Sequence, residues 1–165
     1  MKKILFATII MFAPLSLMAQ KFGHFNSNEV VSALPEATAA QNELQSLQKQ
    51  YEDELKRMQD EFQKKNDEYE KQKTQLLDNI KQLREQELQE LYQRILQSKQ
   101  DNEQALQKAW AEKMQALSEK VLAAAKKIGE AGGYVYIMDT SLGIPYISTT
   151  LSTDITPELK KALGI

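Results

Sequence analysis

The sequence contains no cysteine and only one histidine, His24. Disulfide bridges and lipidation through a cysteine are therefore excluded, so stability has to come from a core, from oligomerisation, or from both. Metal sites usually gather several His, Cys or acidic ligands, which leaves His24 with carboxylates as its only possible partners. We therefore interpret His24 as a surface or packed side chain and expect no metal site.

Catalytic constellations are also missing from the sequence. Acidic clusters such as Glu52 to Glu54 lie among lysines in helix-forming sequence, which is typical of a solvated helix face. Without a pocket to shift their pKa values, these carboxylates have no means of acting as acid and base. The sequence therefore predicts a protein that is not an enzyme and that carries no cofactor.

The amino-terminal segment has the layout of an export signal. Two lysines precede a weakly polar to apolar run of 15 residues, which is shorter than the roughly 20 residues that span a membrane. Small residues follow the run, and Ala19 and Gln20 flank the expected cleavage point. We therefore predict that residues 1–19 are a signal peptide and that the mature chain is secreted without stable insertion into the membrane.

The mature chain is mildly acidic. Once the two lysines of the signal are set aside, 19 basic and 23 acidic residues remain, a formal charge near −4. Lysine pairs such as Lys64 and Lys65 have acidic neighbours, and nucleic-acid binding depends on uncompensated positive charge. We therefore expect no nucleic-acid partner.

Residues 36–131 contain no proline, and no glycine before Gly129, and nearly every residue favours a helix. Apolar residues recur mostly at spacings of three, four or seven in two narrow stripes, which is typical of coiled-coil seams. The stripes comprise Leu44, Leu47, Tyr51, Leu55, Met58, Phe62, Tyr69 and Leu76, and then Leu83, Leu88, Leu91, Ile95, Ala105, Ala109, Met114, Leu117, Val121, Ala124 and Ile128.

Two segments that flank this run read as strands, residues 21–26 and residues 134–139. If both strands belong to one sheet, the helical run must leave and return, which predicts a hairpin rather than a parallel dimeric rod. We place the turn near residues 74–80, where Asp78 or Asn79 would cap a new helix; a turn nearer Leu83 is the alternative.

Shorter elements complete the two ends of the mature chain. Ser27 or Asn28 would cap a short helix that Pro35 closes or restarts. Proline and turn residues around residues 144–148 indicate a second strand, in a hairpin with the preceding one. Thr156 followed by proline opens a last short helix, which ends at Gly164.

In this order, the pieces resemble the Skp/OmpH family of periplasmic chaperones over the whole mature chain. They are Lys21-Phe22-Gly23-His24-Phe25-Asn26, the long Gln/Glu/Lys-rich stretch, Tyr134-Val135-Tyr136-Ile137-Met138-Asp139 after Gly132-Gly133, and Asp154-Ile155-Thr156. The resemblance implies an α+β, mostly α, fold with a long antiparallel coiled-coil hairpin arm on a small β-body shared in a homotrimer. Residues 20–35 and 132–165 would form the body and residues 36–131 the arm.

The resemblance also implies a function. Family members are ATP-independent holdases that keep unfolded outer-membrane proteins in a cavity between three arms, and this sequence agrees, having no glycine-rich phosphate loop. A structural or scaffolding coiled coil of the cell envelope, without chaperone activity, is the alternative. Because the best-known relatives are strongly basic and this chain is acidic, we assign no residues to lipid or lipopolysaccharide binding.

Two sets of residues are predicted to carry this function. Tyr51 and Phe62 also fall on a seam, so packing within the arm is their alternative role, and we expect Trp110 to pack where the arm meets the body. The client-contact set is Tyr51, Met58, Phe62, Tyr69, Leu76, Leu77 and Tyr92. The body and trimer-core set is Phe22, Phe25, Tyr134, Val135, Tyr136, Ile137 and Ile147.

Overall fold

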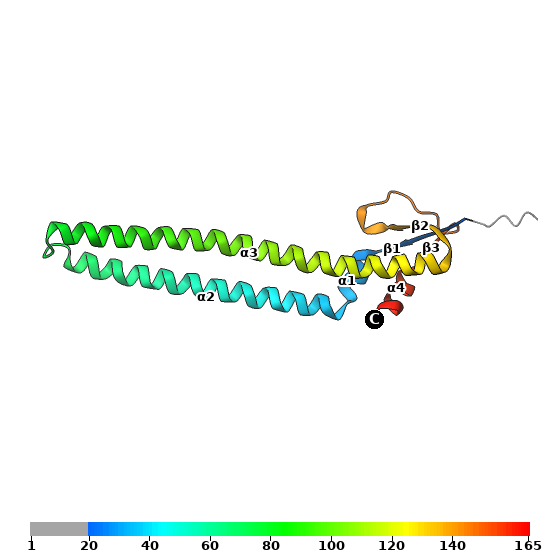
Figure 1. The fold of residues 1–165 in the computed structure, drawn as a ribbon, viewed down its shortest axis with the longest axis horizontal. Coiled ribbons are helices and arrows are strands. Elements are labelled where there is room, and N and C mark those ends of the chain that lie inside the picture. Colours follow the sequence, from blue (N-terminus) through cyan, green and yellow to red (C-terminus); the bar gives the residue numbers. More distant parts are fainter. Residues whose placement is uncertain (1–19) are drawn as a thin grey trace, which may run out of the picture.

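The structure, a computed structural model, describes residues 20–165, and the expected signal peptide lies outside the described residues. A small body sits at one end of a long hairpin of two helices (Figure 1). The elements are β1 (Lys21–Phe25), α1 (Ser27–Ala33), α2 (Pro35–Gln72), α3 (Asp78–Gly132), β2 (Tyr134–Asp139), the 3-10 turn η1 (Thr140–Leu142), β3 (Ser152–Asp154) and α4 (Thr156–Leu163). The predicted fold class, a helical arm on a small β-body, is confirmed for the single chain.

The chain reverses direction between α2 and α3, over residues 73–77. We had expected Asp78 or Asn79 to cap α3, but neither does. Leu77 is the N-cap residue, and its carbonyl accepts hydrogen bonds from the Ile80 and Lys81 amides at 3.0 and 2.9 Å. Asp78 lies in the first turn instead, where the helix dipole favours a negative charge.

Two other helix starts also differ from the prediction by one residue. Asn26, rather than Ser27 or Asn28, caps α1, because its side-chain oxygen accepts a hydrogen bond from the Glu29 amide at 3.2 Å. Ile155 takes the N-cap position of α4, and Asp154 accepts a hydrogen bond from the Thr156 amide at 2.9 Å. In each case a side chain one or two residues before the expected cap accepts a hydrogen bond from one of the first amides of the helix.

The body contains one sheet of three parallel strands in the order β2-β1-β3. In its centre Gly23 is paired with Ile137 on one side and with Thr153 on the other. The strands that flank the helical run therefore lie side by side, so the helical run must leave the sheet and return to it. The arm is a hairpin and not a single rod.

The prediction of a second strand at residues 144–148 is wrong, since the structure has no strand there. Pro145 has no backbone N–H to donate to a ladder, which disfavours a strand there. The chain turns after it, because the Ser148 hydroxyl accepts a hydrogen bond from the Leu151 amide at 3.1 Å. The third strand follows at Ser152–Asp154 and pairs parallel with β1, not antiparallel with β2.

The main core lies in the body, where the sheet, α1 and α4 pack on the last turns of α3 (Figure 1). Its buried members are Phe25, Val30, Leu34, Leu117, Val121, Ala125, Ile128, Ile155 and Leu159. A core of this size is small for a chain of 165 residues, because most of the chain forms the arm.

A thinner seam joins α2 to α3 along the arm. Nearly all residues of the two predicted stripes are buried or half-buried, but Leu83 is an exception and stays exposed. On a helix, Leu83 lies about 140° from Leu88 and about 120° from Ile95, so it points away from α2. Counting spacings without angles placed Leu83 in the seam by mistake.

Candidate functional site

Large apolar side chains remain exposed on two parts of the molecule, the arm and the body. Those of the arm and its base are Leu77, Leu83, Tyr92, Leu96, Trp110 and Leu122. Those of the body are Val135, Tyr136, Met138, Leu142, Tyr146 and Leu151. No large apolar side chain is exposed along α2, so the outer surface of α2 is polar, whereas that of α3 is not.

The predicted client-contact residues of α2 lie in or near the seam. Tyr51 and Met58 are half-buried. Phe62 is half-buried as well, and its ring centroid lies 5.9 Å from that of Tyr92 on α3. Tyr69 is only 6% exposed, so little of it is available to a partner in this conformation.

The remaining predicted contacts are more accessible. Leu76 is half-buried and Leu77 is exposed, both at the turn of the hairpin. Tyr92 is 48% exposed although one side of its ring faces Phe62. The seven residues therefore do not form one surface: those on α2 serve packing at least in part, and Leu77 and Tyr92 lie at separate points.

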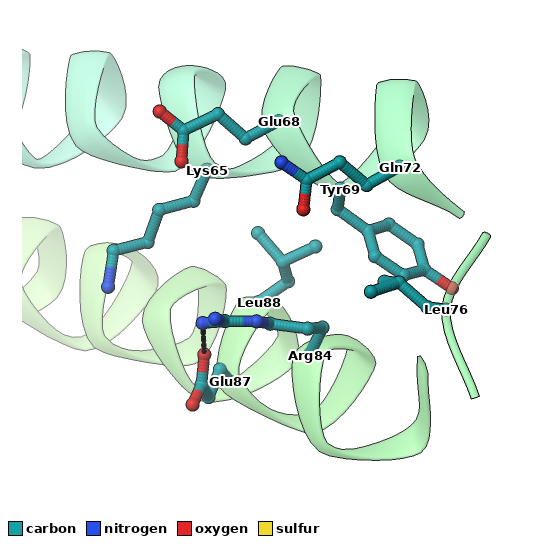
Figure 2. A pocket seen from close by; sticks show the side chains of 8 residues that line it. All are labelled: Lys65, Glu68, Tyr69, Gln72, Leu76, Arg84, Glu87 and Leu88. Carbon is teal, nitrogen blue, oxygen red and sulfur yellow. Dashed lines mark hydrogen bonds and ion pairs between the residues drawn. The ribbon is translucent and has the colours of Figure 1, made fainter. Parts of the chain in front are cut away.

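A small cavity lies near the turn of the hairpin, where Tyr69 and Leu76 lie close together and Leu88 projects between the helices (Figure 2). Charged residues surround it, and Arg84 forms an ion pair with Glu87 at 2.8 Å. Its volume of about 70 Å³ has room for a few water molecules. Organic ligands and cofactors occupy pockets of roughly 300 Å³ or more, so this cavity is too small to be their site.

Tyr69 connects the two helices beside this cavity. Its hydroxyl donates a hydrogen bond to the Glu85 carboxylate on α3. This hydrogen bond, together with desolvation and the charges of Glu85 and Glu70, raises the pKa of Tyr69 to about 12. The residue that we expected to contact a client is thus a polar link between the helices near the tip.

Sequence reasoning missed two exposed residues of α3. We had expected Trp110 to pack where the arm meets the body, but it is 57% exposed on the arm. Leu96, at 45% exposed, was not considered at all. A signal was available, since each directly follows a seam residue, Ala109 or Ile95, and adjacent helical residues point about 100° apart.

The base of the arm carries cross-helix ion pairs. Glu36 pairs with Lys120 and Glu43 pairs with Lys113, and no other ion pair between α2 and α3 occurs in residues 20–165. The hydrogen bond from Lys120 holds the pKa of Glu36 below its usual value. All four side chains are about half exposed, so these pairs contribute little to stability.

The sheet of the body has an apolar outer face. The ring centroids of Phe22 and Tyr136 are 4.7 Å apart, and Ile147 is half-buried beside them at a cavity of about 280 Å³. Seven further residues complete its lining: Gly23, Met138, Tyr146, Ser148, Leu151, and the pair His24 and Ser152, whose Nδ1 and Oγ atoms are 2.8 Å apart.

The predicted body residues divide between two faces. Phe25, Tyr134 and Ile137 belong to the intramolecular core or pack against it. Val135 is exposed, and Tyr136 stays half exposed on the outer side. The sheet also has two open edges, since β2 and β3 each have a neighbour on one side only within the described chain.

Two aspartates at the ends of strands tie the body together. Burial opposes ionisation of Asp139, but hydrogen bonds from Ser27 and Ser141 outweigh it and lower its pKa. Asp154 is similar: burial raises its pKa, while hydrogen bonds from Thr156 and the charge of His24 bring the pKa below its ordinary value. Both carboxylates therefore act as structural acceptors.

A family model described as outer membrane protein (OmpH-like) matches residues 21–163. The chain belongs to the OmpH-like family. The match runs from β1 to the end of α4, so it includes the sheet and both arm helices. The family resemblance inferred from the sequence is confirmed.

The OmpH-like fold is also found among solved structures. A candidate outer membrane chaperone (OmpH-like) from Caulobacter crescentus CB15 matches with a TM-score of 0.70 and 16% sequence identity, covering 87% of this chain and 83% of the other. At this identity the match shows a shared fold. No curated protein matches the chain.

Two further properties concern the described residues alone. Within residues 20–165, no helix is both long enough and apolar enough to cross a membrane. The same residues contain no group of three or more His, Cys, Asp or Glu side chains arranged to hold a metal ion.

Proposed function

We propose that this OmpH-like protein is an ATP-independent holdase of the periplasm, which binds unfolded outer-membrane proteins and prevents their aggregation. The observation that carries the proposal is the long arm with exposed apolar side chains on α3, joined to a small body with open sheet edges. Membership of the OmpH-like family and the fold shared with a candidate outer membrane chaperone support a chaperone role in general.

The proposed active form is a homotrimer, the number of subunits that the family resemblance implies. Open strand edges invite pairing with another chain. If β2 of one subunit paired with β3 of the next, three sheets would close into a ring, and the outer-face residues Phe22, Tyr136 and Leu151 would be covered. Closed cyclic assembly of this kind leaves no edge exposed.

Client binding would occur in the space between three arms. The exposed apolar residues of one arm are few and are separated by polar residues, so each contact with a client would be weak. Contacts from three arms act together through a high effective concentration. Such a surface suits a chaperone that holds many different clients and releases them without ATP.

The sequence also supports the proposed location. The segment before Gln20 has the layout of a signal peptide, which would deliver the mature chain to the periplasm. We expect amino-terminal sequencing of the protein from a periplasmic extract to begin at Gln20. A chain that keeps residues 1–19 and stays with the membrane would contradict this part of the proposal.

The holdase activity is tested by diluting a urea-unfolded outer-membrane barrel protein into buffer with or without the mature protein. At a near-stoichiometric ratio we expect turbidity to be largely suppressed, with no nucleotide present. A scaffolding coiled coil would leave the aggregation of the barrel protein unchanged, so that outcome would favour the alternative function.

The assembly is tested by the native mass from light scattering, for which we expect three times the mass of one chain. Val135→Asp should reduce the mass to that of one chain, because Val135 is exposed on the edge strand β2. Ile137 is a poor choice, since its side chain packs on Gly129 of α3 within the same subunit. Tyr92→Ala, on the arm, serves as the control and should remain trimeric.

A further inference from the structure

One line along α3 carries large apolar side chains from the body into the arm, interrupted by the charged residues Lys99 and Glu103. Tyr92, Trp110 and Ile128 are separated by 18 residues each, which corresponds to five full turns, so the three side chains lie in line. Leu117 and Val121 fall within about 20° of this line. The same face of the helix therefore belongs to the body at one end and to the arm at the other.

Burial along this face changes abruptly. In the body Val121 and Ile128 are buried beneath the other elements. In the arm Tyr92 and Trp110 are about half exposed, although one side of the Tyr92 ring faces Phe62 of α2. We name Tyr92, Leu96, Leu106 and Trp110 the α3 stripe; Leu106 is its one half-buried member.

The α3 stripe is distinct from the seam. The face of α3 that packs on α2 includes Ala109 and Asn102, which lie about 100° and about 80° from Trp110 around the helix axis. The pairing of α2 with α3 therefore covers the stripe only in part, as where the ring of Tyr92 faces Phe62. The line of the body core thus continues along the arm as two apolar pairs, Tyr92 with Leu96 and Leu106 with Trp110, which the ion pair of Lys99 and Glu103 separates.

We propose that the α3 stripe is the docking surface for extended, alternating apolar segments of unfolded outer-membrane β-barrel proteins. This inference rests on the proposed function and names the part of the arm that holds the client. The surface would take such segments because its spacing, its charge and its place in the molecule each fit them.

The spacing of the stripe matches that of an extended chain. Tyr92 and Leu96, and likewise Leu106 and Trp110, are one helical turn apart, about 6 Å along the axis. Alternate side chains of an extended chain are about 6.6 Å apart. The whole stripe is about 27 Å long, close to eight extended residues, and a membrane-spanning barrel strand has roughly 9–11 residues of alternating character.

The charges along the stripe do not select for a charged partner. Between its two halves, Lys99 and Glu103 lie 3.9 Å apart as an ion pair. Beyond Trp110, Lys113 is paired with Glu43 of α2. The charged groups within and beside the stripe are thus paired, and its two apolar pairs suit the lipid-facing residues of many barrels.

A second copy of the chain is a less suitable occupant. The features that invite self-association, the open strand edges and the apolar outer face of the sheet, are all in the body. The stripe begins beyond the body and runs toward the tip of the arm. An unfolded client entering between the arms would reach it without displacing a subunit.

Fluorescence gives a direct test, since Trp110 is the only tryptophan of the chain. The probe is a tryptophan-free synthetic peptide of about eleven residues, the length of a barrel strand, with alternating apolar and polar residues. We expect a saturable blue shift of Trp110 emission. A permuted peptide of the same composition with its apolar residues grouped together should bind at least about fivefold more weakly, because fewer of them reach the stripe at once.

A pair of variants links the stripe to chaperone activity. Tyr92→Gln/Leu96→Gln should weaken binding of an unfolded barrel protein about tenfold, without changing native mass or helix content. Gln45→Ala/Lys49→Ala replaces two exposed residues of α2 with the same spacing and should bind like the unmodified protein.

The possible failures can be told apart. If the unmodified protein suppresses aggregation and Tyr92→Gln/Leu96→Gln does so equally well, the docking surface is wrong and the holdase function stands. If the unmodified protein does not suppress aggregation, the proposed function fails, and this inference fails with it. If Trp110 emission shifts blue as the concentration of the protein alone is raised, a second copy covers the stripe and the inference is overturned.

Discussion

The two helices of the arm use their apolar residues differently. α2, with 38 residues, directs its large apolar side chains into the seam with α3 and leaves none of them exposed. α3, with 55 residues, faces α2 on one side and the core of the body on another, and exposed apolar residues continue the second face along the arm on either side of Lys99 and Glu103. A helix that has more apolar surface than its own chain can cover marks where another molecule binds.

The contrast follows from the position of each helix in the fold. α2 has one neighbour over most of its length, so a narrow seam is all that its sequence needs. The carboxyl-terminal half of α3 also supports the sheet, α1 and α4, which requires a second apolar face. Extension of that face beyond the body is not needed for folding of the single chain, which is why we assign it to a partner.

The largest effect should come from charging the body face of α3. Val121 is fully buried, so Val121→Asp places a carboxylate in the core and should cost about 4 kcal/mol or more of unfolding free energy. Urea unfolding at fixed protein concentration measures this loss. Ala116→Asp, on an exposed position of the same helix, should change the free energy by less than about 0.5 kcal/mol. A stable Val121→Asp protein would show that this face is not a core.

Two adjacent residues separate the seam from the stripe. Ile95 is buried in the seam, so Ile95→Ala should cost about 2 kcal/mol and speed amide exchange in the arm more than in the body. Leu96→Ala, one residue later, should cost less than about 0.5 kcal/mol and should instead weaken client binding. Equal losses of stability from the two substitutions would contradict the division of α3 into two faces.

The fold was largely accessible from the sequence. Long helices reveal themselves through composition and periodicity, and two flanking strands in one sheet required a hairpin. The error at residues 144–148 arose because the strand signal of Ile144 and Ile147 is local, whereas the pairing of Ser152–Asp154 with β1 is a contact between distant parts of the chain. Three polar residues, Ser152 to Asp154, carry no apolar pattern by which a strand could be recognised.

The candidate site was less accessible, for a geometric reason. Apolar spacing shows that Tyr51, Phe62 and Tyr69 lie on one face of a helix, but not whether a second helix covers that face. The structure places all three at the seam. The prediction for Trp110 was wrong in the opposite direction. A large aromatic side chain near a core stripe usually fills the core, and the sequence does not show that the core of the body ends before Trp110, which is exposed.

A smaller effect, and a gain in stability, is expected from the middle of the seam. The Asn102 side-chain nitrogen is buried with no hydrogen-bond partner, at a position seven residues from both Ile95 and Ala109. Asn102→Leu should therefore add about 1 kcal/mol of unfolding free energy and slow amide exchange in the arm. Asn42→Leu, at an exposed position of α2, is the control and should change little. A loss of stability in Asn102→Leu would show that the polar side chain has a partner in the seam.

The smallest effect tests the link between α2 and α3 near the tip. The hydrogen bond that Tyr69 donates to Glu85 raises the pKa of Tyr69 to about 12, above the value of about 10 in an unfolded chain. The contribution of this link to stability should therefore be complete below pH 10 and should disappear as the pH rises through about 12. In an absorbance titration of phenolate, Tyr69→Phe should remove one tyrosine of six and with it a step near pH 12. Glu85→Gln removes the charge that favours the protonated hydroxyl, so that step should move to lower pH; if it does not move, Glu85 is not the cause of the shift.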